Sequence, residues 1–441
     1  MPIDIINTLV VKGTDGIPGW PIIKRYGLPF VALSLLKVYC GGKLNPWQRD
    51  VHGKVYILTG ATAGVGSQLA EELAKGGAQL ILLVKDPSSS WTVEFVDDLR
   101  ERTGNPLVYA EQCDLADLHS VRKFATRWLD NTPPRRLDGI VGCAGEALPL
   151  GAARSTSSDG VERQVAVNYL GHFHLLALLS PSLRAQPADR DVRVVLTTCT
   201  TQAMGQVSLD DPLWLDSQYP SKRPWQVFGG AKLMLGCFAQ EFQRRLDATP
   251  RGDKMPSKLR VNVVNPGFMR TASTARVLSF GSLWGLLLYL LLYPIWFILF
   301  KTPIQGAQSY LAALFAEHFI ELPGGQFIQD CKIVKPARKE LSDFTFQNKL
   351  YEKTEKLIDQ LERQSAKQRV RSKPKSNSKS KPSKKSGTAN VGPEKENDVF
   401  ASALKATPPD LFPHQRADPA GNKYLDQLEK KLAEQSKKHS T

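Results

Sequence analysis

Residues 54–75 constrain the fold more than any other part of the chain. A short apolar run, Val55–Leu58, leads directly into Thr59-Gly60-Ala61-Thr62-Ala63-Gly64-Val65-Gly66, and a helical pattern over Ser67–Lys75 follows. Glycines at such a junction permit a tight turn and let backbone N–H groups approach a phosphate at the positive end of a helix. Because these glycines lie between a strand pattern and a helix pattern, they indicate a nucleotide-binding turn that opens a β–α–β unit.

Apolar runs and amphipathic stretches alternate along the chain from this turn to about residue 335. The predicted strands are Leu80–Val84, Gly139–Val141, Val192–Thr197, Leu259–Val264 and Phe327–Val334, and the predicted helices include Val121–Leu129, Val161–Leu179 and Ala231–Leu246. Short β-branched runs between helices are typical of a parallel sheet that is covered on both faces. We therefore predict an α/β fold for residues 51–340, a Rossmann-type doubly wound parallel sheet flanked by helices.

The C-terminal part of the chain differs in composition from this domain. Phe346, Leu350, Leu357 and Leu361 stand at helical spacing, which predicts an amphipathic helix within residues 341–370. Residues 371–441 are expected to be mostly disordered, because their Lys/Ser/Pro tract cannot build a core.

Residues 364–393 hold nine Lys or Arg and no Asp or Glu, so this stretch accounts for more than half of the net charge of +15. The tail is either simply solvated or attracted to an anionic membrane surface. Nucleic acid is not an expected partner, because no aromatic residues interleave the charges to stack on bases.

Six cysteines lie far apart with no C-x-x-C pair. This spacing predicts no metal site and no disulfide framework, and it indicates reduced thiols on the cytosolic side.

Two apolar stretches lie outside the regular pattern. Residues 1–50 form an N-terminal extension in which Tyr26–Leu36 is uncharged and flanked by basic residues. This stretch is too short to span a bilayer, so it either lies in a membrane surface or packs on the protein's own core.

Val277–Phe300 carries no charge and is apolar on all sides, although Pro294 interrupts it. Because strands are predicted on both sides of this segment, we expect a kinked insertion into one leaflet rather than a crossing; a buried helical lid is the alternative.

The spacing T-G-x-x-x-G-x-G resembles that of the short-chain dehydrogenase/reductase family, and further motifs follow in that family's order over residues 53–335. They are Cys113-Asp114-Leu115, Gly142-Cys143-Ala144-Gly145, Val167-Asn168-Tyr169-Leu170-Gly171-His172-Phe173, Asn265-Pro266-Gly267-Phe268-Met269-Arg270-Thr271, Lys301-Thr302-Pro303 and Gly324-Gly325-Gln326-Phe327. The V-N-x-L-G-H-F helix is similar to that of the retinol-dehydrogenase-like branch. The resemblance implies a nicotinamide dinucleotide held by Gly60, Thr62, Gly64, Val65, Gly66, Asp114, Ala144, Gly145, Lys232, Pro266, Gly267 and Thr271.

The choice of cofactor is predicted from charge. NAD-specific members of the family end their second strand with an acid that binds the ribose hydroxyls and repels a 2′-phosphate. Here that position is Val84, and Lys85 follows it. Because a lysine can pair with the 2′-phosphate, we predict NADP(H). The alternative is that Lys85 is an ordinary solvated lysine.

The catalytic residues are where the chain departs from the family. The resemblance implies a Tyr-x-x-x-Lys pair, a serine and an asparagine, for which this chain has Phe228, Lys232, Thr198 and Asn168. A phenyl ring carries no exchangeable proton, and loss of a general acid typically slows a reaction by about 10²–10⁴-fold. Neither Tyr169 nor Tyr219 is expected to replace the missing tyrosine.

Two functions remain open on these grounds. The first is an NADP(H)-dependent oxidoreductase that interconverts a lipophilic alcohol and an aldehyde or ketone at a cytosol-facing membrane, either the endoplasmic reticulum or a lipid droplet. The second is a catalytically impaired relative that binds the cofactor and acts as a membrane-associated interaction or regulatory protein. Phe228 favours the second. We prefer the first, because Lys232, Asn168 and Thr198 remain and a bound water could replace the missing phenol. A homodimer is compatible with both.

Overall fold

The computed structural model describes residues 20–250 and 255–372. The first 19 residues of the N-terminal extension and the tail predicted from residue 371 lie outside the described residues, apart from the last two residues of a long C-terminal helix.

A single sheet forms the centre of the fold, with its eight strands in the order β3-β2-β1-β4-β5-β6-β7-β8. The strands are β1 (Val55–Thr59), β2 (Gln79–Val84), β3 (Val108–Gln112), β4 (Gly139–Gly142), β5 (Val192–Thr197), β6 (Leu259–Asn265), β7 (Phe327–Gln329) and β8 (Lys332–Ile333). All neighbouring pairs from β3 to β7 are parallel. The strand order reverses between β1 and β4, which confirms the predicted doubly wound sheet and places its ligand crevice at the carboxyl ends of these two strands.

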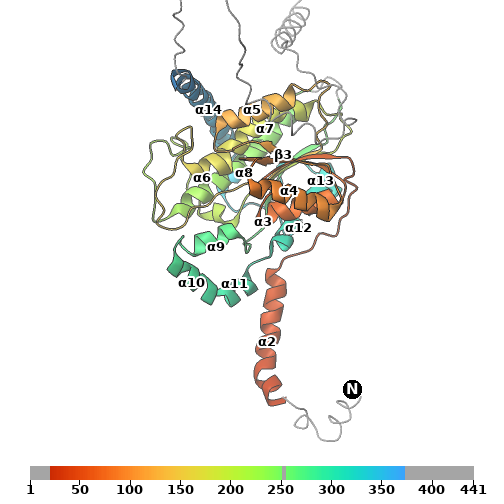
Figure 1. Cartoon of the computed structure of the whole chain (residues 1–441), viewed down its shortest axis with the longest axis vertical. Helices are drawn as coiled ribbons and strands as arrows, with labels where there is room; N and C mark the ends of the chain where they lie inside the picture. The colour runs from red at the N-terminus through yellow and green to blue at the C-terminus, as the bar shows by residue number, and fades with distance from the viewer. Residues whose placement is uncertain (1–19, 251–254, 373–441) are drawn as a thin grey trace, which may run out of the picture. The chain divides into compact units, whose positions relative to one another are not determined.

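Helices cover both faces of the sheet (Figure 1). One face carries α3 (Gly64–Lys75), α4 (Ser90–Thr103), α12 (Pro303–Phe315) and the short α13 (His318–Glu321). The other face carries α5 (Leu118–Leu129), the short α6 (Arg163–Val165), α7 (Gly171–Arg184) and α8 (Pro224–Ala248). Each face has its own apolar core, with Leu69 and Tyr310 in the first and Phe124 and Phe173 in the second. The strands between the two cores are therefore buried on both sides, as their continuous apolar runs predict.

The predicted last strand, Phe327–Val334, was wrong as a single element. The chain forms β7, turns at Asp330 and Cys331, and returns as β8 antiparallel to β7. Asp330 and Cys331 adopt φ values of 50° and 60°. Two consecutive residues in this left-handed region reverse the chain direction, which the apolar pattern on either side of them does not reveal.

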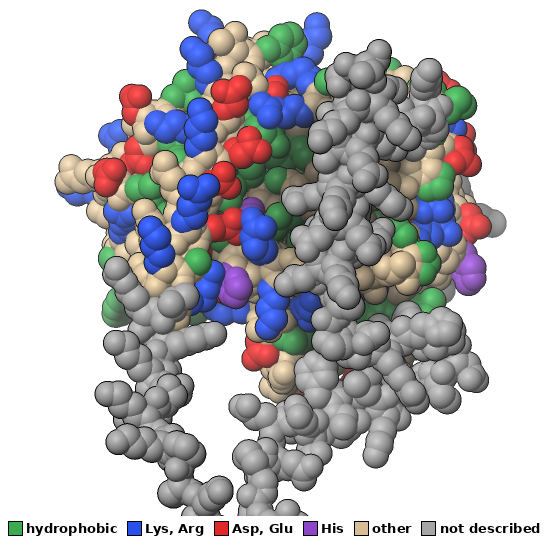
Figure 2. All heavy atoms as spheres, turned by 90° about the horizontal axis from the view of Figure 1, so that it is seen from above, with side chains coloured by type: hydrophobic (Ala, Val, Ile, Leu, Met, Phe, Trp, Pro, Cys, Tyr) green, Lys and Arg blue, Asp and Glu red, His purple; other side chains and the backbone are tan. Residues whose placement is uncertain are grey.

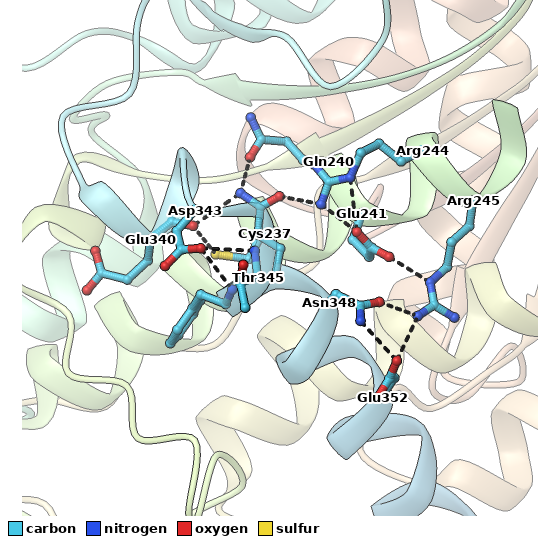
Figure 3. Close-up of polar contacts among 12 residues, drawn as sticks. Cys237, Gln240, Glu241, Arg244, Arg245, Glu340, Asp343, Thr345, Asn348 and Glu352 are labelled. Atoms are coloured by element: carbon cyan, nitrogen blue, oxygen red, sulfur yellow. Dashed lines mark hydrogen bonds and ion pairs between the residues drawn. The ribbon is translucent and has the colours of Figure 1, made fainter. Parts of the chain in front are cut away.

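The amphipathic helix expected within residues 341–370 corresponds to α14 (Phe344–Ser372). Its apolar side enters the core through Leu350, Ile358 and Leu361. Polar contacts to α8 flank this apolar side, and Figure 3 shows Arg245 of α8 reaching both Asn348 and Glu352 of α14. The helix is therefore an integral part of the domain that carries the sheet.

The N-terminal extension forms α2 (Trp20–Cys40), a helix with strongly exposed apolar side chains. Leu28 is 80% exposed and Phe30 is 71% exposed. Of the two alternatives drawn from the sequence, packing on the protein's own core is excluded for this part of the helix.

The segment Val277–Phe300 is broken as predicted. It comprises the end of α9 (Ala272–Leu278), α10 (Leu283–Leu291) and α11 (Tyr293–Leu299), with Pro294 in the first turn of α11. No helix within the described residues is both long and apolar enough to cross a bilayer alone, and α9 with α10 meets that standard only as a pair bent by 108°.

Candidate active site

The turn between β1 and α3 has the geometry of a phosphate cradle. Gly60 and Gly64 adopt φ values of 65° and 61°, which side chains rarely tolerate. A Cβ atom on Gly66 would lie 2.1 Å from the carbonyl oxygen of Gly60, and one on Gly60 would lie 2.7 Å from the backbone nitrogen of Ala144. These glycines are therefore required by the close packing of the turn against α3 and against the segment that follows β4.

Other residues predicted to hold the cofactor surround this turn. Thr62 is half-buried within the turn, and Val65 is buried at the start of α3. Thr271 approaches the turn from the opposite side, since its Cγ2 atom would lie 3.4 Å from a Cβ on Gly64. Pro266 and Gly267 directly follow β6 and lead to Thr271. The structure thus brings the β1–α3 turn and the segment after β6 together at the carboxyl edge of the sheet.

Lys85 and Asp114 lie at the carboxyl ends of β2 and β3. Lys85 Nζ is 3.5 Å from Asp114 Oδ2, and 70% of the Lys85 side chain is exposed. The other carboxylate oxygen of Asp114 accepts a hydrogen bond from the backbone N–H of Ala116. An exposed ion pair of this length is weak, so Lys85 can exchange the carboxylate for another anion at little cost.

Asn168 is fixed within a π-helical turn, Ala166–Leu170, between α6 and α7. Its amide Nδ2 donates to the carbonyl oxygens of Gln164 and Glu146, at 2.8 and 2.7 Å. Its Oδ1 accepts the backbone N–H of Glu146 at 3.2 Å. A Cβ on Gly145 would lie 2.8 Å from Asn168 Oδ1 and 3.4 Å from Lys232 Nζ. Asn168, Gly145 and Lys232 therefore meet at one point.

Lys232 is a buried ammonium on α8, with only 2% of the residue exposed. Its Nζ lies 5.9 Å from the centre of the Phe228 ring, and no described residue accepts a hydrogen bond from it. Burial lowers the pKa of Lys232 to about 8, and the nearby thiols of Cys199 and Cys143 partly offset this effect. Lys232 Nζ is not one of the described atoms that are fully enclosed without a partner, so the ammonium keeps an opening through which a ligand can approach it.

The structure buries Thr198 and leaves the next residue, Cys199, partly exposed. The Thr198 hydroxyl donates to Gln202 Oε1 at 2.7 Å and lies 3.5 Å from the carbonyl oxygen of Lys232. The Cys199 thiol shares a hydrogen bond with the Thr201 hydroxyl at 2.6 Å and interacts electrostatically with Lys232. Thr198 therefore stays the predicted counterpart of the family's serine, and Cys199 is a second polar group near Lys232 that the sequence analysis did not single out.

The other polar residues considered from the sequence have partners away from this point. The Tyr169 hydroxyl shares a hydrogen bond with Thr354 of α14 at 2.8 Å, and the Tyr219 hydroxyl accepts one from Gln164 at 3.1 Å. His172 is buried, with Nε2 3.0 Å from the Thr59 hydroxyl. Within the described ranges, no group of His, Cys, Asp or Glu side chains is arranged to hold a metal ion.

Comparison with known proteins agrees with this geometry. Residues 54–208 match the family model described as short chain dehydrogenase. The uncharacterized oxidoreductase pbr1 of Schizosaccharomyces pombe is 40% identical over 84% of this chain and 99% of its own length. The chain belongs to the short-chain dehydrogenase family. As a member of it, the protein is an oxidoreductase.

Two further relatives lie in the retinol-dehydrogenase-like branch, as the motifs predicted. Human retinol dehydrogenase 13 is 31% identical over 76% of this short-chain dehydrogenase and 96% of its own length. Mouse polyprenol dehydrogenase is 34% identical over 69% of the chain and 84% of its own length. Among solved structures, an uncharacterized protein of Mycobacterium paratuberculosis is 26% identical, with a TM-score of 0.50 over 72% of this chain and 96% of its own.

Proposed function

We propose that the protein is an NADP(H)-dependent oxidoreductase that interconverts a lipophilic alcohol and the corresponding aldehyde or ketone at a membrane or lipid-droplet surface. The observation that carries the proposal is the buried Lys232 ammonium, which faces Asn168 and Gly145 at the carboxyl edge of the sheet and has no acceptor in the described protein.

The residues present fit a nicotinamide dinucleotide. Positive φ values at Gly60 and Gly64 and the tight approach of Gly66 leave backbone N–H groups at the start of α3 free of side-chain obstruction. Lys85 can bind a 2′-phosphate in place of Asp114, and Lys232 can donate to ribose hydroxyls. The bound cofactor would supply or accept the hydride; the protein positions it and handles the proton.

The proton is the step in which this chain departs from its family. Phe228 offers no hydroxyl, whereas the Lys232 ammonium, with a pKa of about 8, carries a transferable proton at neutral pH. The half-buried Phe228 ring lacks the oxygen atom of a tyrosine, and a water molecule in that space can relay the proton from Lys232 to a substrate oxygen. Asn168 keeps Glu146 and Gln164 in place beside this path.

The lipophilic substrate class is supported by the helices beside the site. Arg270, in the segment that follows β6, binds α11 through the Tyr293 hydroxyl at 3.3 Å, and its guanidinium lies 4.7 Å from the centre of the Phe297 ring. A Cβ on Gly281, in the turn before α10, would lie 3.3 Å from Pro149, shortly after the Gly145 turn. The apolar helices therefore adjoin the route to Lys232. Two relatives carry the names of lipophilic alcohols, retinol and polyprenol.

Phe228 is the one observation that favours a second candidate, a cofactor-binding protein without turnover. The deciding experiment measures NADPH oxidation by the purified full-length protein against long-chain aldehydes and ketones, with NADPH affinity measured separately by calorimetry. Turnover establishes the oxidoreductase. NADPH binding without turnover, for the wild type and for Phe228→Tyr alike, would establish the second candidate.

A further inference from the structure

The side chain of Lys37 connects the apolar helix α2 of the N-terminal extension to the apolar helix α11. Lys37, near the end of α2, donates from Nζ to the carbonyl oxygen of Phe297 at 2.6 Å and to that of Phe300 at 3.3 Å. These carbonyl groups lie in the last turn of α11 and at its C-terminal end, where no intrahelical donor remains for them. The last turn of α11 has no basic residue of its own. Lys37 therefore supplies the positive charge that stabilises the negative C-terminal end of the helix dipole.

The contact is reinforced by the Phe297 ring. Lys37 Nζ lies 5.0 Å from the centre of this ring, and the guanidinium carbon of Arg270 lies 4.7 Å from it. Phe297 thus connects α2 to the segment that runs from β6 past the candidate active site. We call Lys37 and its two acceptors on α11 the Lys37 latch.

Beyond the latch, α2 exposes apolar side chains along its length. Leu28, Phe30, Leu35 and Val38 are each more than 60% exposed. They do not share one face, since 100° separates successive residues of a helix, so no single groove of a partner protein would cover them. An isolated apolar helix is marginal in water but stable in an apolar solvent, which satisfies its side chains on all sides.

The helices on the other side of the latch, α10 and α11, lie near the C-terminal end of α2 (Figure 1) and are also apolar. On α10, Leu283, Trp284 and Leu291 are 85%, 82% and 75% exposed. By contrast, the face seen in Figure 2 shows Lys and Arg side chains interspersed with Asp and Glu, as a solvated surface does.

The charges next to this apolar surface are mostly positive. Residues 20–44 contain Lys24, Arg25, Lys37 and Lys43, and residues 266–301 contain Arg270, Arg276 and Lys301; neither range contains an Asp or a Glu, although Asp330 pairs with Lys301. A surface that is apolar around a whole helix and bordered mainly by basic residues complements an anionic lipid bilayer, which surrounds the helix with apolar solvent and offers negative headgroups.

We propose that α2 and α10–α11 form one composite docking surface for an anionic lipid bilayer, held in a single arrangement by the Lys37 latch. The inference rests on the proposed membrane association and specifies how the chain achieves it. Two apolar elements from distant parts of the sequence enter the same leaflet together, and neither depends on the basic tail. Because α11 is also bound to Arg270, docking orients the route to Lys232 towards lipid.

The test uses the full-length protein, vesicles of phosphatidylcholine with or without phosphatidylserine, and hydrogen–deuterium exchange. We expect vesicles that contain phosphatidylserine to bind more tightly and to protect α2 and α10–α11 together. Lys37→Met makes α2 more apolar, so independent binding of the two elements predicts equal or higher affinity. A latch predicts the opposite. The affinity for vesicles should fall at least ~10-fold, because the second element no longer binds at high effective concentration. In hydrogen–deuterium exchange, α2 should lose its protection while α10–α11 keeps it.

Matched variants separate the surface from general effects of charge. Leu28→Glu on α2 and Leu287→Glu on α10 should each weaken vesicle binding, whereas Val93→Glu on α4, also an exposed apolar position, should not. Unchanged vesicle affinity in Leu28→Glu or in Lys37→Met would overturn the composite surface. Protection of α2 in the absence of lipid, together with the hydrodynamic size of a dimer, would instead assign the surface to a second copy and also overturn it. Loss of NADPH binding with intact vesicle binding would count against the proposed function and not against this surface.

Discussion

Lys232 Nζ lies 5.9 Å from the centre of the Phe228 ring, one turn away on α8. They stand where the sequence analysis places the family's tyrosine and lysine, and only the lysine carries a transferable proton. We expect Phe228→Tyr to raise the rate of carbonyl reduction by at least about 10-fold, because a general acid typically accelerates such a reaction by ~10²–10⁴-fold. Phe228→Leu, which changes the ring without adding a hydroxyl, is the control. A Phe228→Tyr enzyme as slow as Phe228→Leu, with normal NADPH affinity, would show that more than the acid is missing.

The pH dependence of the wild-type enzyme should follow Lys232. Burial lowers its pKa to about 8, so the ammonium is present below that pH and is progressively lost above it. If the ammonium is the proton source, reduction should slow by about 10-fold per pH unit above pH 8. Lys232→Arg keeps the charge at high pH and should remove this fall at the expense of a lower rate, because a guanidinium does not release its proton. A wild-type rate that is flat to pH 10 would contradict the assignment.

The residues after β5 offer two donors for the substrate oxygen, the Thr198 hydroxyl and the Cys199 thiol. If the thiol faces the substrate, Cys199→Ser should place a stronger donor beside the substrate oxygen and raise the rate of the Phe228→Tyr enzyme further, by roughly 10-fold. Thr198→Val should instead lower the free energy of unfolding by about 1–3 kcal/mol, because it removes the donor to Gln202 Oε1 in the interior. Rates per folded molecule and urea unfolding curves distinguish the two; a Thr198→Val enzyme that is stable but inactive would assign the donor to Thr198.

Lys85 should determine the preference between the two cofactors. Lys85→Glu is expected to weaken NADPH binding by about 10-fold or more, since a hydrogen bond to a charged group contributes about 1.5–3 kcal/mol, and to leave NADH binding nearly unchanged. Lys123→Glu, an exposed lysine on α5 on the other face of the sheet, controls for net charge. Calorimetric titration measures both; equal affinities of the wild type for NADPH and NADH would remove the argument for NADP(H).

Packing of α14 should contribute measurably to the stability of the domain. Leu350 is fully buried, and its replacement by alanine is expected to lower the free energy of unfolding by about 2–5 kcal/mol. Lys349→Ala, at the neighbouring exposed position, should change it by less than about 0.5 kcal/mol. If both variants unfold at the wild-type urea concentration, α14 is only loosely attached to the sheet-bearing domain.

The sequence predicted elements best where burial is continuous. The strand Val192–Thr197 has the predicted bounds, because all six of its residues are buried and apolar runs are the signal of such a strand. The helix α4 and the strand β3 were missed. In α4 only Thr92, Val96 and Leu99 are buried among many charged residues, so no apolar periodicity stands out.

Several properties of this protein were determined by the sequence alone. The glycine turn, the order of the motifs and the spacing of Phe228 four residues before Lys232 are local, because a strand–turn–helix junction and one helical turn fix their geometry. Tertiary packing decided which way side chains point and which distant segments meet. The burial of Thr198 against Gln202, the pairing of Lys85 with Asp114, and the contact of Lys37 with α11 about 260 residues away each depend on how separate elements lie in space. Spacing along the chain carries no information about such contacts, because the packing of the sheet, and not the local backbone, brings them together.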